Sequence, residues 1–242
     1  MSKGIIYTPR IRKSPFFKET IKSGATNFTT YNHMIMPVGY TSLEDEYKSL
    51  IKDVTLWDVA AERQVQVIGE DAAKFVQYLT PRNLSTFKDG FCRYAFLTDE
   101  NGGIINDPLI LKFSDQKFWL SLADSDALLW CKGVASSGRF NVEITEPEAC
   151  PLSLQGPKSK DLMKKITNDD DVVMGLKYYQ FIETRLFDLD LIVARSGWSN
   201  QFGYEIYITR EEDGGALWRG LMEAGKEFKI VPSCPNQIDR IE

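Results

Sequence analysis

The hydrophobic pattern in the first third of the chain predicts a helix followed by a strand–helix unit. Residues 42–52 place apolar side chains at helical spacing behind a serine, and Asp45 three positions on completes a capping-box-like start. Residues 64–68 alternate between polar and apolar side chains, as a half-buried strand does. Residues 70–79, between a glycine and a proline, have the period of an amphipathic helix.

The middle of the chain carries strand-like runs in close succession. These runs cover residues 92–98, 104–113 and 117–123. Turn-forming residues separate them at 99–103 and 114–116, which are lengths typical of hairpin connections. We therefore predict a three-stranded antiparallel meander.

The second half repeats a strand–helix–strand rhythm. After a helix at 125–135 and a strand at 141–145, two prolines flank an expected junction, so we divide the chain into a first α+β subdomain (1–147) and a second one (148–242). The elements predicted beyond the junction are a strand at 151–155, a helix at 157–166, extended segments at 181–195 and 203–209, and a helix at 211–228. The fold class is α+β, with mainly antiparallel sheets and flanking helices. Residues 237–242 have the pattern of a helix that begins, so we expect the fold to continue beyond them.

Charge and hydropathy exclude several classes of partner. The 242 residues carry a net charge of -5, and the 29 basic residues are scattered rather than gathered into a stripe, so we expect no nucleic-acid partner. No apolar run approaches the length of a membrane span, and the N-terminus has no signal-peptide core. We expect a cytoplasmic protein with no membrane partner; the oligomeric state stays open.

Histidine and cysteine usage excludes further chemistries. The single histidine, His33, rules out a histidine metal cluster and the usual serine–histidine triad, and we interpret it as a structural hydrogen-bonding residue. The four cysteines are far apart, without the paired spacing of zinc or dithiol sites, so we expect no metal. We interpret them as small apolar residues in a reducing compartment.

The first candidate for chemistry is the carboxylate of Asp107. It lies in residues 101–108, where a glycine turn and a short apolar strand precede it and a following proline holds its backbone extended. The alternative is that Asp107 only accepts backbone hydrogen bonds beside a proline turn.

The second candidate is a polar, aromatic loop between two strands at residues 194–207. Glu205 and Tyr207 fall on one face of the strand that follows the loop. Aromatic rings with a carboxylate that accepts two parallel N–H bonds suit a flat heteroaromatic ligand. The alternative is ordinary hairpin packing with a surface glutamate.

Motifs in these segments resemble the glycine-cleavage T-protein family of aminomethyltransferases. The stretches that carry the resemblance are Gly-Gly-Ile-Ile-Asn-Asp-Pro at 102–108, Leu-Gln-Gly-Pro at 154–157 and Arg-Ser-Gly-Trp through Gly-Tyr-Glu-Ile-Tyr at 195–207. Further segments resemble the dimethylsulfoniopropionate demethylase branch of the family, at 31–34, 56–60, 62–65, 79–82, 123–126 and 234–236. The resemblance runs from Arg10 to Glu242.

The resemblance implies a tetrahydrofolate site. It places Asp107 near the reacting nitrogen as the catalytic carboxylate and Glu205 at the pterin edge, with Tyr94, Trp198 and Tyr207 lining the folate pocket. Tyr31 or Trp198 would face a sulfonium group, since aromatic rings attract cations.

The activity that the resemblance implies is redox-neutral methyl transfer. A small-molecule methyl donor, dimethylsulfoniopropionate, would give its methyl group to N5 of tetrahydrofolate. The alternatives are aminomethyl transfer, O- or N-demethylation at the same folate site, and a folate-binding module without catalysis. Pro235-Asn236-Gln237, with Arg240 further on, replaces an Ala-Arg-Asp motif of the glycine-cleavage proteins, which argues against a glycine-cleavage role. Full-length family members continue into a C-terminal β-rich domain, which would begin beyond Glu242.

Overall fold

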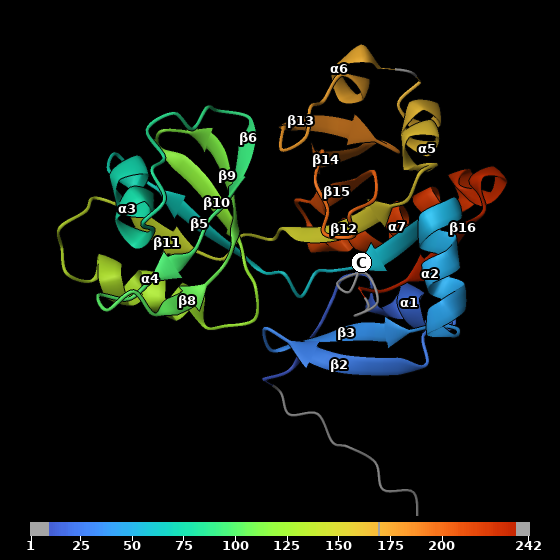
Figure 1. The fold of residues 1–242 in the computed structure, drawn as a ribbon, viewed down its shortest axis with the longest axis horizontal. Coiled ribbons are helices and arrows are strands. Elements are labelled where there is room, and N and C mark those ends of the chain that lie inside the picture. Colours follow the sequence, from blue (N-terminus) through green and yellow to red (C-terminus); the bar gives the residue numbers. More distant parts are fainter. Residues whose placement is uncertain (1–9, 169, 236–242) are drawn as a thin grey trace, which may run out of the picture.

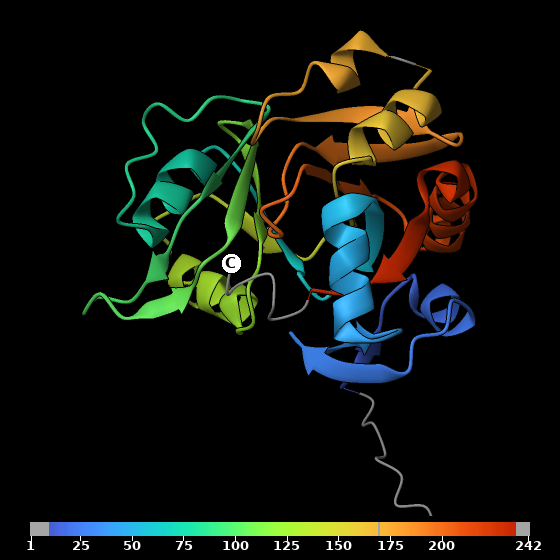
Figure 2. The same ribbon diagram turned by 45° about the vertical axis from the view of Figure 1, so that its right-hand side comes forward.

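The computed structural model describes residues 10–168 and 170–235, arranged as two large sheets with helices on their outer faces and two smaller sheets (Figures 1 and 2). The helices are α1 (Phe17–Lys22), α2 (Leu43–Lys52), α3 (Ala72–Leu79), α4 (Ala127–Ala135), α5 (Ser159–Ile166), α6 (Asp171–Met174), α7 (Gly214–Ala224) and the short 3-10 turns η1 (Glu211–Asp213) and η2 (Lys226–Phe228). The strands are β1 (Arg12–Lys13), β2 (Asn27–Tyr31), β3 (Met34–Gly39), β4 (Val54–Asp58), β5 (Gln64–Ile68), β6 (Phe91–Tyr94), β7 (Leu97–Thr98), β8 (Ile104–Asn106), β9 (Leu109–Ser114), β10 (Lys117–Ser121), β11 (Glu143–Thr145), β12 (Cys150–Gln155), β13 (Phe181–Leu186), β14 (Leu189–Ala194), β15 (Gly203–Ile208) and β16 (Ile230–Ser233).

A five-stranded antiparallel sheet forms one side of the molecule. Its strand order is β11-β5-β10-β9-β6, and its last three strands are the predicted meander. Two of the predicted runs break where Pro108 interrupts the ladder, because proline has no N–H to donate. The pieces cut off by this break, β7 and β8, pair as a small sheet of their own.

Alternation along β9 and β10 divides the two faces of the five-stranded sheet. Ile110 and Phe118 point into a core that also contains side chains of α3 and α4. Leu111 and Trp119, one position along, belong instead to a cluster that contains Phe181 from the six-stranded sheet. The two sheets therefore pack face to face through this second cluster.

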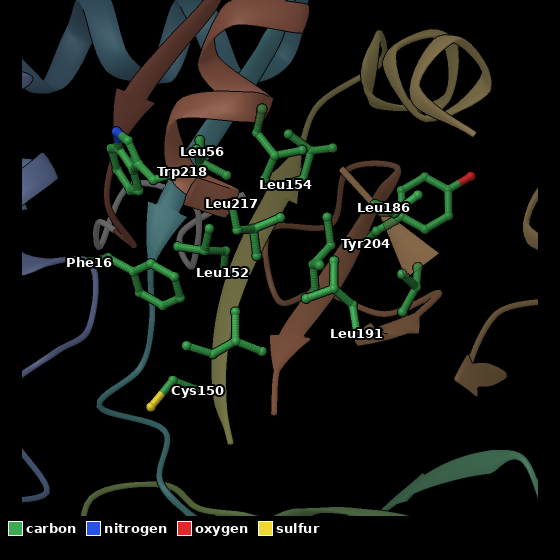
Figure 3. Close-up of a cluster of buried hydrophobic side chains, with 14 of the residues drawn as sticks. Phe16, Leu56, Cys150, Leu152, Leu154, Leu186, Leu191, Tyr204, Leu217 and Trp218 are labelled. Atoms are coloured by element: carbon green, nitrogen blue, oxygen red, sulfur yellow. The ribbon is translucent and has the colours of Figure 1, made fainter. Parts of the chain in front are cut away.

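The six-stranded sheet has the order β13-β14-β15-β12-β4-β16 and is antiparallel except where β16 runs parallel to β4. One of its faces packs against α5 and α7, in a core where Leu152 and Tyr204 meet Leu217 and Trp218 (Figure 3). Trp218 is 1% exposed, so burial of this large ring is a main source of stability on this side. The hairpin β2–β3, with β1, forms a third sheet beneath it (Figure 1).

The six-stranded sheet combines strands from both sides of the predicted division at residue 147. The division falls between β11 and β12, which lie in different sheets. However, β4 precedes the division and pairs with both β12 and β16. The connection from β4 to β5 therefore crosses from one sheet to the other.

Several predicted elements are confirmed and one is corrected. The helix at 42–52 is α2, whose N-cap Ser42 accepts a hydrogen bond from the backbone N–H of Asp45 over 3.1 Å. The segment 181–195 is not one strand but the hairpin β13–β14, which turns at Phe187 and Asp188 with φ of 53° and 61°. The predicted helix at 237–242 lies outside the described residues. No helix within the described ranges is long and apolar enough to cross a membrane.

Candidate active site

Asp107 lies between β8 and β9, where its neighbours fix the backbone. The side-chain amide of Asn106 donates to the carbonyl oxygen of Ala123 and to the hydroxyl of Ser125, each over 2.8 Å, and its oxygen accepts from the N–H of Ala123. Asn106 is buried, whereas the Asp107 side chain is partly exposed. The hydroxyl of Tyr94 donates to Oδ2 of Asp107 over 2.6 Å. The predicted Tyr94 and Asp107 are therefore in direct contact.

Tyr31 approaches the same place from the β2–β3 hairpin. Burial, together with the negative charges of Glu62, Asp124 and Asp107, raises the pKa of the Tyr31 hydroxyl to about 12. The adjacent turn residue Asn32 docks the hairpin onto the segment that contains Asp124. Tyr31, Tyr94 and Asp107 thus gather at one end of the site.

Glu205 forms the other end of the site, on the face of β15 that points toward the five-stranded sheet. Its side chain is buried, and its Oε2 accepts hydrogen bonds from the hydroxyls of Ser196 (2.6 Å) and Tyr207 (3.2 Å). Burial raises the pKa of the Glu205 carboxyl, and these two hydroxyls lower it in part because they stabilise the charged form. Glu205 and Tyr207 share one strand face, as predicted.

Tyr207 lies beneath Glu205 rather than on an open surface. Its ring is fully buried, with its centroid 6.3 Å from that of Trp119. Burial raises the pKa of its hydroxyl well above the usual value, so it stays protonated and donates to Glu205. Tyr207 therefore orients the Glu205 carboxylate through this hydrogen bond.

The loop before β15 is held in place by Gln155 of the Leu-Gln-Gly-Pro motif. Oε1 of Gln155 accepts from the hydroxyl of Ser199 over 2.8 Å, and its Nε2 approaches the carbonyl oxygen of Ser196. A Cβ at Gly197, where φ is 153°, would lie 2.3 Å from the Gln155 amide, so only glycine fits there. This packing couples two motifs that are distant in sequence. Trp198 projects from the loop with 43% of its surface exposed.

Glu62 is a site residue that the sequence pattern did not single out. It lies on the connection between β4 and β5, and its negative charge contributes to the raised pKa values of Tyr31 and Tyr207. Burial and the negative charge of Glu205 raise the pKa of the Glu62 carboxyl well above its usual value. The only sequence signal was its position in the segment 62–65, which carried no assigned role.

Other predicted or prominent residues lie apart from this chemistry. His33 is exposed, and its Nε2 is 3.0 Å from Oδ1 of Asp126, as expected for a structural residue. The four cysteines are buried thiols. A cavity of about 160 Å³ that Arg12, Arg63 and Glu146 help to line includes none of the predicted site residues. The counterpart of the family's Ala-Arg-Asp motif lies largely outside the described residues.

The arrangement suits a flat ligand rich in N–H donors. Burial raises the pKa of two carboxyls, Glu62 and Glu205, and no basic side chain in the described residues forms an ion pair with either. Two such charges repel, so one carboxyl takes up a proton unless a ligand supplies donors or positive charge. Asp107, beside Tyr94, is partly exposed.

Comparison with known proteins supports the family resemblance that the sequence motifs indicated. The GCVT N-terminal domain family matches residues 16–240. The chain belongs to this family. Among its GCVT-family relatives, dimethylsulfoniopropionate demethylase of Ruegeria pomeroyi is 38% identical over 96% of this chain and 64% of that protein. Aminomethyltransferase of Thermosipho melanesiensis is 32% identical over 92% of this chain and 60% of that protein.

A solved GCVT-family structure has the same fold. The glycine cleavage system aminomethyltransferase T of Bartonella henselae superposes with a TM-score of 0.79 at 22% identity, covering 92% of this chain and 59% of that one. This likeness confirms the predicted α+β class with mainly antiparallel sheets. The chain spans less than two thirds of the length of each of these relatives.

Proposed function

We propose that the chain transfers a methyl group from dimethylsulfoniopropionate to N5 of tetrahydrofolate, giving methylmercaptopropionate and 5-methyltetrahydrofolate. The observation that carries the proposal is the pairing of two held carboxylates: Glu205, anchored by two hydroxyls, and Asp107, anchored by Tyr94. Family membership and the identity to a dimethylsulfoniopropionate demethylase support it.

The residues present fit tetrahydrofolate. A pterin edge presents neighbouring N–H donors, and Glu205 is a buried acceptor with no basic partner among the described side chains. Ser196 and Tyr207 hold the Glu205 carboxylate in one orientation, so Glu205 would bind that edge without rearrangement. Tyr94 and Trp198, both partly exposed, would supply surface to the rings.

The chemical step requires alignment and one proton acceptor. The methyl carbon forms a bond to N5 as its bond to sulfur breaks, and the electron pair of that bond returns to sulfur. Asp107 stabilises the positive charge that develops on nitrogen and accepts its proton, directly or through a water. Tyr94 fixes the orientation of the Asp107 carboxylate by donating to Oδ2, the oxygen that does not face the ligand. A sulfonium methyl is already activated, so no covalent enzyme intermediate is needed.

A second candidate is aminomethyl transfer, or demethylation of an O- or N-methyl compound, at the same folate site. The observation in its favour is the 32% identity to an aminomethyltransferase. A third candidate is folate binding without catalysis. The retention of both Asp107 and Glu205 in hydrogen-bonded settings argues for catalysis over this third reading.

Incubation with tetrahydrofolate and a panel of methyl-labelled donors separates these candidates. The panel contains dimethylsulfoniopropionate, a methyl ether and a methylamine, and the product is analysed by mass spectrometry. Labelled 5-methyltetrahydrofolate from the sulfonium alone supports the proposal. Label transferred only from the ether or the amine selects O- or N-demethylation. Folate binding with no labelled product from any donor rejects methyl transfer and is the result expected for aminomethyl transfer or for the third candidate.

A further inference from the structure

Residues 196–202 join β14 to β15 in a loop whose backbone takes positive φ at two places. These are Gly197, with φ of 153°, and Asn200, with φ of 58°. The loop also carries Ser196, whose hydroxyl donates to Oε2 of Glu205 over 2.6 Å. Positive φ departs from strand geometry, so side chains must hold such a loop in one shape. The shape of the loop therefore decides whether Ser196 reaches the carboxylate.

Arg195 ties the two ends of this loop together. Its backbone is held by the preceding segment, because its N–H donates to the carbonyl oxygen of Gln180 over 2.8 Å and its carbonyl oxygen accepts from the N–H of Tyr179 over 2.9 Å. Its side chain spans the loop, and Nη1 donates to the carbonyl oxygen of Gly203 over 2.9 Å. Gly203 is the first residue of β15. The residue before the loop is thus bonded to the residue after it.

The guanidinium of Arg195 also lies over an aromatic ring at the end of the loop. Its central carbon is 3.5 Å from the centroid of the Phe202 ring, and the rings of Tyr178 and Tyr204 lie 5.7 and 5.8 Å away. Phe202 is itself anchored, since its carbonyl oxygen accepts from the N–H of Gly156 over 2.8 Å. A planar guanidinium stacks on such a ring, which a lysine ammonium cannot do.

Arg195 is half-buried, and in the part of the chain that the structure describes it forms no ion pair with a carboxylate. Its ring partners Phe202 and Tyr204 belong to the core on the outer face of the six-stranded sheet. Glu205, next to Tyr204 in β15, points to the opposite face, as alternation along a strand requires. Arg195 therefore acts on the Glu205 site through the loop and not by direct contact.

We propose that Arg195 is a positioning residue for Glu205, holding residues 196–202 in the shape that keeps the Ser196 hydroxyl on the Glu205 carboxylate. The inference rests on the proposed folate site and adds the residue that keeps its buried acceptor oriented. Glu205 binds the pterin edge in that proposal, whereas Asp107 acts at N5. Loss of Arg195 should therefore weaken folate binding and leave turnover at saturating folate within about twofold.

The test is a double-mutant cycle on tetrahydrofolate affinity, measured by calorimetric titration of the full chain. Arg195→Met, which removes the guanidinium but keeps an apolar stem, should lower the affinity about three- to tenfold. If Arg195 acts through Ser196, the double variant with Ser196→Ala should bind at most about twofold more weakly than the weaker single variant. Arg195→Lys should recover only part of the affinity. Arg185→Met, at an exposed position on β13, is the matched control and should change nothing.

Hydrogen exchange of the unliganded chain separates this inference from the proposed function. Arg195→Met should speed exchange of the amides of residues 196–202 at least about tenfold and leave those of α3 and α7 unchanged. A residue that only adds to global stability would instead speed exchange throughout the chain. The exchange pattern therefore reports the shape of the loop whether or not a ligand binds.

Any of three results would overturn the inference: additive affinity losses in the cycle, unchanged exchange of residues 196–202 in Arg195→Met, or equally faster exchange throughout the chain. If the folded, unmodified chain binds no tetrahydrofolate, the proposed function fails. Faster exchange confined to residues 196–202 would in that case still support Arg195 as the residue that holds the loop. Formation of 5-methyltetrahydrofolate with additive losses would refute only the role of Arg195.

Discussion

The hydroxyl of Tyr94, at the end of β6, donates a hydrogen bond to Oδ2 of Asp107 over 2.6 Å. The bond joins the edge strand of the five-stranded sheet to the β8–β9 connection, so the direction of the carboxylate depends on both. It leaves the other carboxylate oxygen available to a ligand. Substitution of Asp107 removes the carboxylate itself, whereas substitution of Tyr94 removes only the group that orients it.

Asp107→Asn should preserve the fold and tetrahydrofolate binding while lowering turnover. An amide keeps the shape and can still accept from Tyr94, but it cannot take a proton, which costs roughly 10²- to 10⁴-fold in rate. Single-turnover formation of 5-methyltetrahydrofolate measures the loss, with Asp161→Asn on α5 as the control. Full activity in Asp107→Asn would remove Asp107 from the mechanism.

Asn32→Ala should destabilise the chain by roughly 2–4 kcal/mol. Asn32 is buried, and its amide group bonds the carbonyl oxygens of Ala61 and Ala123 and the N–H of Ser125, which would lose their partner. Urea denaturation measures the change. His33→Ala is the matched control, because His33 shares the turn and its positive φ but is exposed. Equal effects of the two substitutions would contradict this account.

Asp58 should make the free energy of unfolding decrease as the pH rises, which is opposite to the usual effect of a carboxyl group. Burial raises the pKa of Asp58 to about 6 from 3.8, although bonds from Ser14 and Ala60 oppose the shift. A raised folded-state pKa gives stability that is fully present below the unfolded pKa and is lost as the pH rises through about 6. The loss is about 3 kcal/mol, because one pKa unit is worth about 1.4 kcal/mol.

Urea denaturation of the chain and of Asp58→Asn at about pH 4 and about pH 7.5 checks this expectation. The variant lacks the titrating group, so its stability relative to the unmodified chain should rise by about 2.5 kcal/mol between the two pH values, because about pH 4 lies just above the unfolded pKa. A constant difference would show that Asp58 does not titrate in this range.

Ser196→Ala should weaken tetrahydrofolate binding without abolishing it. Its hydroxyl stabilises the charged form of Glu205, so its loss raises the pKa of that carboxyl further. We expect affinity at neutral pH to fall by about three- to tenfold and to recover in part as the pH rises. An affinity loss that does not change with pH would assign Ser196 a purely geometric role.

Local patterns predicted most elements of the fold, and the exceptions have physical causes. The helix at 42–52 was recognisable because its cap lies in the sequence itself, at Ser42. The β13–β14 hairpin was not, because Phe187 and Asp188 adopt positive φ without glycine and the flanking residues read as one continuous strand. The position of β4 between β12 and β16 depends on pairing over long sequence distances, which no local pattern encodes.

The site residues were predicted mainly from the resemblance to family motifs, and less from the hydrophobic pattern or the chemistry of single residues. Asp107, Tyr94, Glu205 and Tyr207 are in contact as pairs, but their roles as catalytic and folate-binding residues stay predictions. The sequence pattern also did not indicate that the charge of Glu205 acts on Glu62, because the two residues are distant in sequence. A single glutamate in a loop gives no indication in the sequence of which distant residues lie near it.

The most direct test of the account is titration of tetrahydrofolate into the purified chain and its Glu205→Gln variant, followed by addition of dimethylsulfoniopropionate. The account predicts that the unmodified chain binds tetrahydrofolate and forms 5-methyltetrahydrofolate. Glu205→Gln should bind at least about tenfold more weakly, since a buried charged acceptor is lost. Equal affinity of the two proteins, or no binding by a folded unmodified chain, would contradict the claim that Glu205 holds the folate.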